Sequence, residues 1–196
     1  DWSSDVCSSD LANGKLWREK VFDGIWVQPA AGDAGGAVGA AYAAYHGYLG
    51  QARKLNGHMD GMAGSYLGPV FEDDDIAQRL TAVGAKFTRL TREQMIDQTA
   101  QALADEKAVG WMQGRMEFGP RSLGARSILG DARSPGMQKT LNLKVKYRES
   151  FRPFAPAVLR EDVEKYFDYN DDSPYMLMVA PVVEGRRRKM TADEEK

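Results

Sequence analysis

The chain has 196 residues, of which 43% are hydrophobic and 28% are charged, and its formal net charge is −2. This composition is typical of a globular protein of one ordinary domain or a little more. The single cysteine excludes an internal disulfide framework and a multi-cysteine metal site, and it fits a reducing cytoplasm. No apolar run approaches the roughly 20 residues that span a bilayer. The slightly acidic balance argues against general nucleic-acid binding, which needs a basic surface.

The two ends of the chain are polar and lack a periodic pattern. Residues 1–11 form a Ser- and Asp-rich tract without an initiator methionine, which we expect to be disordered or to be translated adaptor sequence. The other end is a charged tail that follows a predicted strand. We therefore expect the chain to be an internal fragment of a longer protein.

The first structured segment follows from residue 12. Residues 25–27 predict a strand, the glycine-rich residues 29–37 a turn, and the alanine-rich residues 34–49 a helix. Such a unit can present backbone N–H groups to a phosphate, although a tight turn with close packing explains it equally well. Within the turn, Asp33 could cap the helix, or could present oxygen to a metal ion or a ribose.

Residues 51–68 resemble a linker, and both His46 and His58 are expected to be solvated residues without a ligand role. Beyond the linker, Asp73–Asp75 can cap a helix that reaches about residue 84. Thr91 and Gln94 form a capping box for a helix that ends near residue 106. Its apolar stripe is expected to pack in the core and comprises Met95, Thr99, Ala102 and Leu103.

The remaining elements alternate between strand and helix. Residues 109–112 predict a buried strand, Ser134 and Pro135 the start of a helix over 136–146, and residues 154–159 and 175–182 further strands. This alternation predicts an α/β or α+β fold.

Residues 110–159 carry nine bases against three acids, a net charge of +6 within a chain of net charge −2. Single arginines on a helix usually form a solvated face. Here the bases alternate with glycine, proline and aromatic residues, and FGPR and FRPF tie arginines to rigid frames. This pattern predicts a pocket for a small polyanion, because arginine pairs with phosphate oxygens while glycine lets the backbone approach. No complete catalytic triad, carboxylate pair or metal-ligand spacing accompanies it.

Two long segments resemble the O-carbamoyltransferases of the NodU/CmcH type, which modify nodulation factors and cephem or aminoglycoside antibiotics. The segment GWMQGRMEFGPRSLGARSILGDAR…NLKVKYRESFRPFAPAVL is similar to their second domain. The segment GKLWREKVFDGIWVQPAAGDAGGAVGAAY is similar to the end of their first domain. The resemblance covers residues 12–183.

The resemblance implies two folds and one activity. Residues 12–50 would end an actin-like (ASKHA) domain similar to tRNA threonylcarbamoylation proteins, residues 51–68 would be a linker, and residues 69–196 a truncated YrdC-like domain. In such enzymes carbamoyl phosphate and ATP form carbamoyl-adenylate with loss of pyrophosphate. The carbamoyl group then passes to a hydroxyl of a small-molecule or glycan acceptor at the metal-containing first domain.

The resemblance also implies site residues. Carbamoyl phosphate and ATP would be bound by Arg115, Arg121, Ser122, Arg126, Asn142, Lys144, Lys146, Arg148 and Arg152. Of these, Arg121 and Arg148 would be catalytic. Gly32, Gly35 and Gly36 match a nucleotide-phosphate turn, and Asp33 matches a carboxylate that helps to hold a divalent metal, iron or magnesium. The family's His-x-x-x-His metal motif has no counterpart here, so this fragment is expected not to complete the transfer alone.

The implied protein is cytoplasmic, binds neither nucleic acid nor a membrane, and is compatible with a homodimer. Two alternatives stay open at this point. One is a threonylcarbamoyl-adenylate synthase or a hydrogenase-maturation carbamoyltransferase, although the zinc-finger cysteines of the latter are not visible. The other is a noncatalytic RNA-binding module with a YrdC-like fold, which predicts salt-sensitive binding to RNA.

Overall fold

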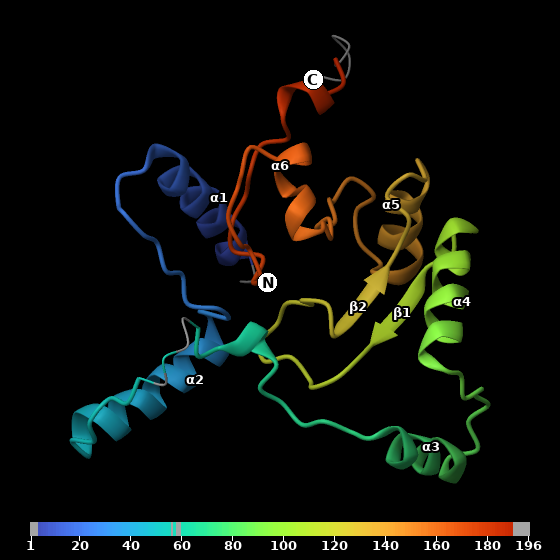
Figure 1. Cartoon of the computed structure of the whole chain (residues 1–196), viewed down its shortest axis with the longest axis horizontal. Helices are drawn as coiled ribbons and strands as arrows, with labels where there is room; N and C mark the ends of the chain where they lie inside the picture. Colours follow the sequence, from blue (N-terminus) through green and yellow to red (C-terminus); the bar gives the residue numbers. More distant parts are fainter. Residues whose placement is uncertain (1–3, 56, 58–59, 190–196) are drawn as a thin grey trace.

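The computed structural model describes residues 4–55, 57 and 60–189 (Figure 1). Helices supply most of the regular structure of these residues, with bounds α1 (Ser4–Glu19), α2 (Asp33–Tyr42), α3 (Asp73–Ala82), α4 (Arg92–Ala104), α5 (Met137–Thr140) and α6 (Val163–Tyr166). Two of them continue as π-helical turns, α2 through Ala43–Tyr48 and α5 through Leu141–Val145. Short 3-10 turns cover Ala63–Ser65, Arg160–Asp162 and Glu184–Arg186. No helix of this described part is long and apolar enough to cross a membrane.

Strands β1 (Val109–Met112) and β2 (Arg126–Leu129) form an antiparallel hairpin. Met112 pairs with Arg126 at one end and Val109 with Leu129 at the other, so residues 113–125 form a long loop at the Met112 end. Helix α5 lies at the opposite end, where a Cβ on Gly130 would come within 2.8 Å of the Met137 side chain. Figure 1 shows these two features on opposite sides of the hairpin, with α4 beside β1.

The local start signals of the helices are largely confirmed. The capping box is present, because the Gln94 amide donates to Thr91 Oγ1 at 3.2 Å and the Thr91 amide donates to Gln94 Oε1 at 3.1 Å. The helix over Asp73–Asp75 is present as α3, but these aspartates do not cap it: the N-cap is Glu72, and the aspartates lie in the first turn, where the helix dipole favours carboxylates. The helix predicted from Ser134 instead has Gly136 as its N-cap. Its range of 136–146 agrees with α5 and its continuation.

Other predictions are wrong in this structure. Residues 25–27, 154–159 and 175–182 do not form strands; within them only Val182 makes an isolated bridge, to Phe167. Strand β2 was not predicted, and α1 begins at Ser4, within the polar tract of residues 1–11. A strand needs a hydrogen-bonding partner as well as an apolar run, and a single sequence does not supply that partner. The mixture of helices and a small sheet agrees with an α/β class, whereas the YrdC-like and actin-like descriptions stay predictions.

The apolar core of the described residues is small. The accessible surface is 15569 Å², against about 9,000 Å² for a compact monomer of this mass. The apolar stripe of α4 is accordingly only half-buried at Thr99, Ala102 and Leu103, and Met95 is 36% exposed. Hydrogen bonds between segments therefore contribute much to how the segments are positioned relative to one another.

One core cluster joins four segments that lie far apart in sequence. Met62, Tyr175 and Leu177 are buried in it. Partly buried hydrophobic side chains pack against these three residues, namely Val27, Phe118 and Leu123. Tyr175 also binds through its hydroxyl, which donates to Asp60 and accepts from the Gly64 amide at 2.9 Å. Burial, followed by the hydrogen bond to Asp60, raises the pKa of Tyr175 to about 12.

Helix α1 lies against the segment that follows Tyr175 (Figure 1). Asn13 donates from Nδ2 to the Leu177 carbonyl at 3.0 Å. One residue on, a Cβ on Gly14 would come within 2.1 Å of the Val179 carbonyl oxygen. Helix α1 therefore packs directly on residues 177–179.

Candidate functional site

The loop between β1 and β2, residues 113–125, is here called the glycine–arginine loop. It is attached to the preceding segment by backbone hydrogen bonds. The Phe118 amide donates to the Ser65 carbonyl at 2.7 Å, and the Met116 amide donates to the Pro69 carbonyl at 2.9 Å. With Phe118 and Leu123 packed on the core cluster, the loop has a fixed inner side.

Glu117 is the acid inside this loop, and its side chain has 0% exposure. Its Oε1 accepts from the Leu123 and Ala125 amides, both at 2.8 Å. Its Oε2 accepts no hydrogen bond but lies 3.3 Å from Arg126 Nε, an ion pair without directed geometry. In the sequence, Glu117 is distinguished only as one of the three acids among residues 110–159. The signal that could have singled it out is that it is the only acid between residues 110 and 130.

Arg126 was expected to bind a substrate phosphate, but the structure uses it within the loop. In addition to Glu117, it donates from Nη2 to the Gly119 carbonyl and, at 3.3 Å, to the Arg121 carbonyl. Its side chain is 33% exposed. Arg126 therefore stabilises the backbone conformation of the loop.

The same loop touches the glycine-rich turn of the first segment. Gly119 has a φ of +101°, and a Cβ there would lie 2.6 Å from the Ala30 Cβ. Only glycine fits this approach without strain. The FGPR motif and the turn that precedes α2 are thus in van der Waals contact, although 89 positions separate the two residues.

The other predicted anion ligands in the loop differ in exposure. Arg115 and Ser122 are exposed, and Arg121 is half-buried. Since Arg121 lies between the Gly119 and Leu123 positions that Arg126 and Glu117 bind, its backbone is held on both sides.

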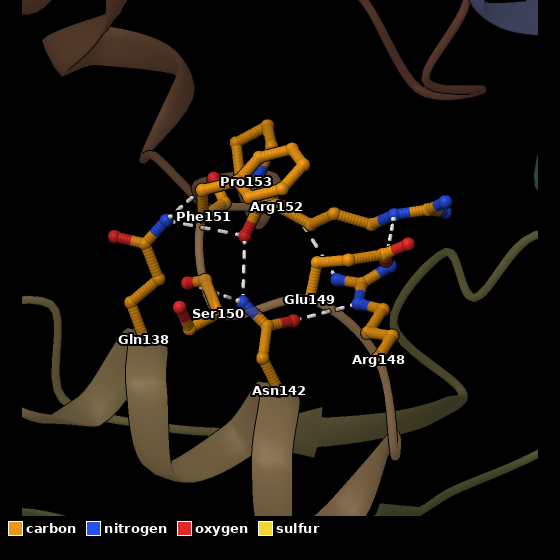
Figure 2. A network of polar contacts seen from close by, with 8 residues as sticks. All are labelled: Gln138, Asn142, Arg148, Glu149, Ser150, Phe151, Arg152 and Pro153. Atoms are coloured by element: carbon orange, nitrogen blue, oxygen red, sulfur yellow. Dashed lines mark hydrogen bonds and ion pairs between the residues drawn. The ribbon is translucent and has the colours of Figure 1, made fainter.

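A second group of predicted ligands lies around Asn142, at the α5 end of the hairpin (Figure 2). Asn142 is fully buried, and its Nδ2 donates to the Ser150 carbonyl at 3.1 Å and to the Arg152 carbonyl at 2.8 Å. Its Oδ1 accepts from Arg148 Nε at 2.6 Å. Exposed Gln138 adds bonds to the carbonyls of Phe151, at 3.1 Å, and Arg152, at 3.2 Å. Asn142 is therefore the centre of a scaffold rather than an exposed ligand.

Arg148 is held in one plane by this scaffold. Its guanidinium carbon lies 4.8 Å from the centre of the Phe154 ring, in addition to the bond to Asn142. The only other hydrogen bond that this guanidinium makes among the described residues is a long one, 3.5 Å, to the Pro153 carbonyl. Arginine has five N–H donors in a rigid fork. Most of its outer donors therefore stay available to a ligand in a set direction.

Glu149 lies between the two arginines of this group (Figure 2). Arg152 Nε lies 2.9 Å from Glu149 Oε2, and both side chains are more than half exposed. A hydrogen bond from its own backbone amide and the charges of Arg152 and Arg148 lower the pKa of Glu149. Lys144 and Lys146 lie at the C-terminal end of the π-helical continuation of α5 and are exposed. The group has an excess of positive charge that is open to solvent.

The nine predicted ligands are thus divided into two groups, and they do not form one locus. The group of Arg115, Arg121, Ser122 and Arg126 lies at the Met112 end of the hairpin. The group of Asn142, Lys144, Lys146, Arg148 and Arg152 lies at the Leu129 end. Four-residue strands separate these ends by about 10 Å.

The glycine turn before α2 is tight. The Gly35 amide donates to the Ala30 carbonyl at 2.7 Å, and a Cβ on Gly35 would lie 2.4 Å from that oxygen. The Gly36 amide donates to the Gly32 carbonyl at 2.9 Å. These amides are used inside the turn and the first turn of α2, which favours the packing explanation over phosphate binding for Gly35 and Gly36.

Asp33 is exposed on the first turn of α2, and the N-cap residue is Gly32. The described residues contain no group of three His, Cys, Asp or Glu side chains that could hold a metal ion. His46 Nδ1 lies 2.7 Å from the Gln51 carbonyl oxygen, and His58 lies outside the described residues. Asp33 alone does not make a metal site, so no reaction step is assigned to a metal here.

Comparison with known proteins agrees with the two segments that the sequence singled out. Residues 6–42 match the family model described as carbamoyltransferase N-terminus, and residues 100–193 match the model described as carbamoyltransferase C-terminus. The chain belongs to the carbamoyltransferase family. The glycine turn with Asp33 lies in the first matched segment, and both groups of basic residues lie in the second.

Curated relatives of the chain include nodulation proteins. It is 53% identical over 192 residues to an uncharacterized protein of Synechocystis, covering 97% of this chain and 31% of the relative. It is 41% identical over 190 residues to the nodulation protein NolNO of Sinorhizobium fredii, covering 95% of this chain and 27% of the relative. A 3'-hydroxymethylcephem-O-carbamoyltransferase of Streptomyces clavuligerus is 46% identical over 78 residues, which is 40% of this chain and 15% of that enzyme. The chain thus spans about a third of the length of its first two relatives.

Proposed function

We propose that this carbamoyltransferase sequence is part of an enzyme that activates carbamoyl phosphate with ATP and transfers the carbamoyl group to a hydroxyl. For the atoms to balance, carbamoyl phosphate first loses phosphate to water and leaves carbamate. A carbamate oxygen then attacks the α-phosphorus of ATP, and pyrophosphate leaves. Finally the acceptor hydroxyl attacks the carbamoyl carbon and releases AMP.

Arg148 is the observation that carries the proposal. Buried Asn142 fixes its Nε and the Phe154 ring fixes its plane, so the outer N–H groups are oriented before a ligand arrives. Preorganised donors stabilise charge that develops on phosphorus or on a leaving phosphate without reorganisation at the moment of reaction. A planar fork also matches a phosphate or carbamate in a bidentate manner, as a lysine would not.

The division of the basic residues supports two ligands instead of one. The glycine–arginine loop presents Arg121 and exposed Arg115 at one end of the hairpin, and Arg148, Lys144 and Lys146 lie at the other. Carbamoyl phosphate and ATP each carry phosphate oxygens that such groups neutralise. Two sites about a strand length apart allow both substrates to be bound in the same complex.

Two experiments test the proposal. In the full-length Synechocystis relative, pyrophosphate release from ATP should require carbamoyl phosphate; a requirement for threonine and bicarbonate would favour the threonylcarbamoyl-adenylate alternative instead. In the present chain, Arg148→Ala should weaken binding of carbamoyl phosphate or ATP by about ten- to a hundredfold, the loss of one charge-assisted contact. Arg148→Lys should restore little of it.

Arg133→Ala is the matched control. Arg133 lies in the same basic stretch, is 79% exposed and pairs with Asp131 instead of facing the Asn142 scaffold. Its loss should change binding less than about twofold. Equal effects of Arg148→Ala and Arg133→Ala would mean that only net charge matters. A binding curve for RNA that falls steeply with salt, without any response to carbamoyl phosphate, would favour the RNA-binding alternative.

A further inference from the structure

Backbone groups of alternate residues in the glycine–arginine loop bond to the Glu117–Arg126 ion pair. The carbonyls of Gly119 and Arg121 accept from Arg126, and the amides of Leu123 and Ala125 donate to Glu117. These four contacts cover the whole segment from Gly119 to Ala125. The side chains of Glu117 and Arg126 therefore hold the backbone of residues 119–125 on its inner side.

We propose that Glu117 and Arg126 are positioning residues for Arg121, and that neither binds the phosphate itself. This inference rests on the proposed role of Arg121 in anion binding. Because the Arg121 carbonyl is bound by Arg126 and the Leu123 amide by Glu117, the backbone on both sides of Arg121 is fixed. The backbone from which the Arg121 side chain projects is therefore held by a pair that does not touch the ligand.

The charge of Glu117 argues for this indirect role. A carboxylate repels phosphate oxygens, so a buried acid in an anion-binding loop disfavours the ligand. We therefore expect such an acid to have a role within the protein. Its Oε1 has two amide donors and its Oε2 faces Arg126, so this carboxylate is used within the protein. Removal of one partner of a buried ion pair leaves an uncompensated charge, which couples the two residues strongly.

Arg126 has a matching geometry. Its Nε faces Glu117 and its Nη2 donates to two loop carbonyls. A guanidinium with these contacts bridges the carboxylate and the loop backbone. Lysine has no planar fork and cannot reproduce that bridge.

The test uses the 196-residue chain, carbamoyl phosphate as the probe, and four variants: Glu117→Gln, Arg121→Ala, the double substitution, and the control Glu149→Gln. Glutamine keeps an oxygen for the two amides but removes the charge that holds Arg126. Glu149→Gln removes the same charge from an exposed pair elsewhere in the basic stretch. The readouts are the dissociation constant of the folded protein and amide hydrogen exchange at Leu123 and Ala125.

Glu117→Gln should raise the dissociation constant about tenfold, because small misplacements of a binding group cost this much or more. In the Arg121→Ala background the same change should add less than about twofold, since the group that it positions is gone. Exchange at the Leu123 and Ala125 amides should become faster, and Glu149→Gln should leave these amides unchanged. A purely structural role predicts instead an equal loss in both backgrounds, and that result would overturn the proposal.

Two further outcomes separate this inference from the proposed function. If Arg121→Ala weakens binding while Glu117→Gln does not, the positioning role is wrong and the anion site stands. If Arg121→Ala leaves binding unchanged, the assignment of Arg121 fails and the inference fails with it. Should Glu117→Gln not fold, Arg126→Gln at the half-exposed partner must show the same dependence on Arg121, or the proposal is refuted.

Discussion

Asn142 gives the sharpest prediction about the scaffold behind Arg148. Replacement by alanine removes two bonds to loop carbonyls and one bond from the Arg148 guanidinium. Neutral hydrogen bonds contribute about 1 kcal/mol each and a bond to a charged group about 1.5 kcal/mol or more. Because the side chain has no exposed surface, we expect Asn142→Ala to lower the free energy of unfolding by about 3 to 4 kcal/mol.

Asn142→Asp separates the two functions of this residue. Aspartate keeps an acceptor for Arg148 but turns its second oxygen toward the carbonyls of Ser150 and Arg152, which repel it. We expect about 2 kcal/mol of destabilisation from the two lost donors. Arg148 should stay oriented, so that carbamoyl phosphate binding is less affected than in Asn142→Ala.

Gln138→Ala is the control for both variants. Gln138 donates to the Phe151 and Arg152 carbonyls from an exposed position, so water replaces it at a cost below about 0.5 kcal/mol. Urea unfolding followed by circular dichroism gives the free energies, and amide exchange over residues 148–153 shows whether the loss is local. If Asn142→Ala costs no more than Gln138→Ala, burial does not determine the strength of this network.

Three more predictions concern the segments that hold the site. Burial and Asp60 keep Tyr175 neutral in the folded state, so its contribution to stability is present below pH 10 and is lost as the pH rises through about 12. Urea unfolding at pH 9 and pH 11 should show this loss in the native chain and a smaller one in Tyr175→Phe; equal losses would contradict the shift. Gly119→Ala should cost about 1–3 kcal/mol, because it combines a positive φ with a Cβ clash, and Ala30→Gly should relieve part of it; a neutral Gly119→Ala would disprove the contact. Thr91→Ala should lower the free energy of unfolding, measured by thermal unfolding, by about 1 kcal/mol; an unchanged stability would show that α4 does not depend on its cap.

Features of the fold that depend on neighbouring residues were predictable from the sequence. The capping box of Thr91 and Gln94 is a local signal, since both partners lie within one helical turn. The strand over 109–112 was found, but its partner over 126–129 was not, because a long loop separates them and RSIL is too short to show a pattern. Conversely, the apolar run over 25–27 found no partner strand and stays partly exposed.

The candidate site was predictable in composition but not in geometry. Charge and glycine content located the basic stretch, and the resemblance supplied ligands for it. Neither shows which polar side chains turn inward. Arg126 and Asn142, which are predicted to bind substrate, hold backbone carbonyls in the structure, and no role was predicted for Glu117. Burial depends on contacts with distant segments, such as the Ser65 carbonyl beneath Phe118, and these contacts are not visible in a single sequence.

Those contacts also bear on where this family can be cut. The C-terminal family match starts at residue 100, yet amides of the glycine–arginine loop donate to the carbonyls of Ser65 and Pro69, and the loop contacts Ala30. A fragment that starts at residue 100 would retain the nine basic and polar residues of 115–152 that are predicted to bind carbamoyl phosphate and ATP. It would lose the residues before 100 that contact the loop. The segment that matches the C-terminal family model therefore does not include all the residues that contact this loop. Recombination between relatives should preserve the loop only when residues 30–70 and 113–125 come from the same parent.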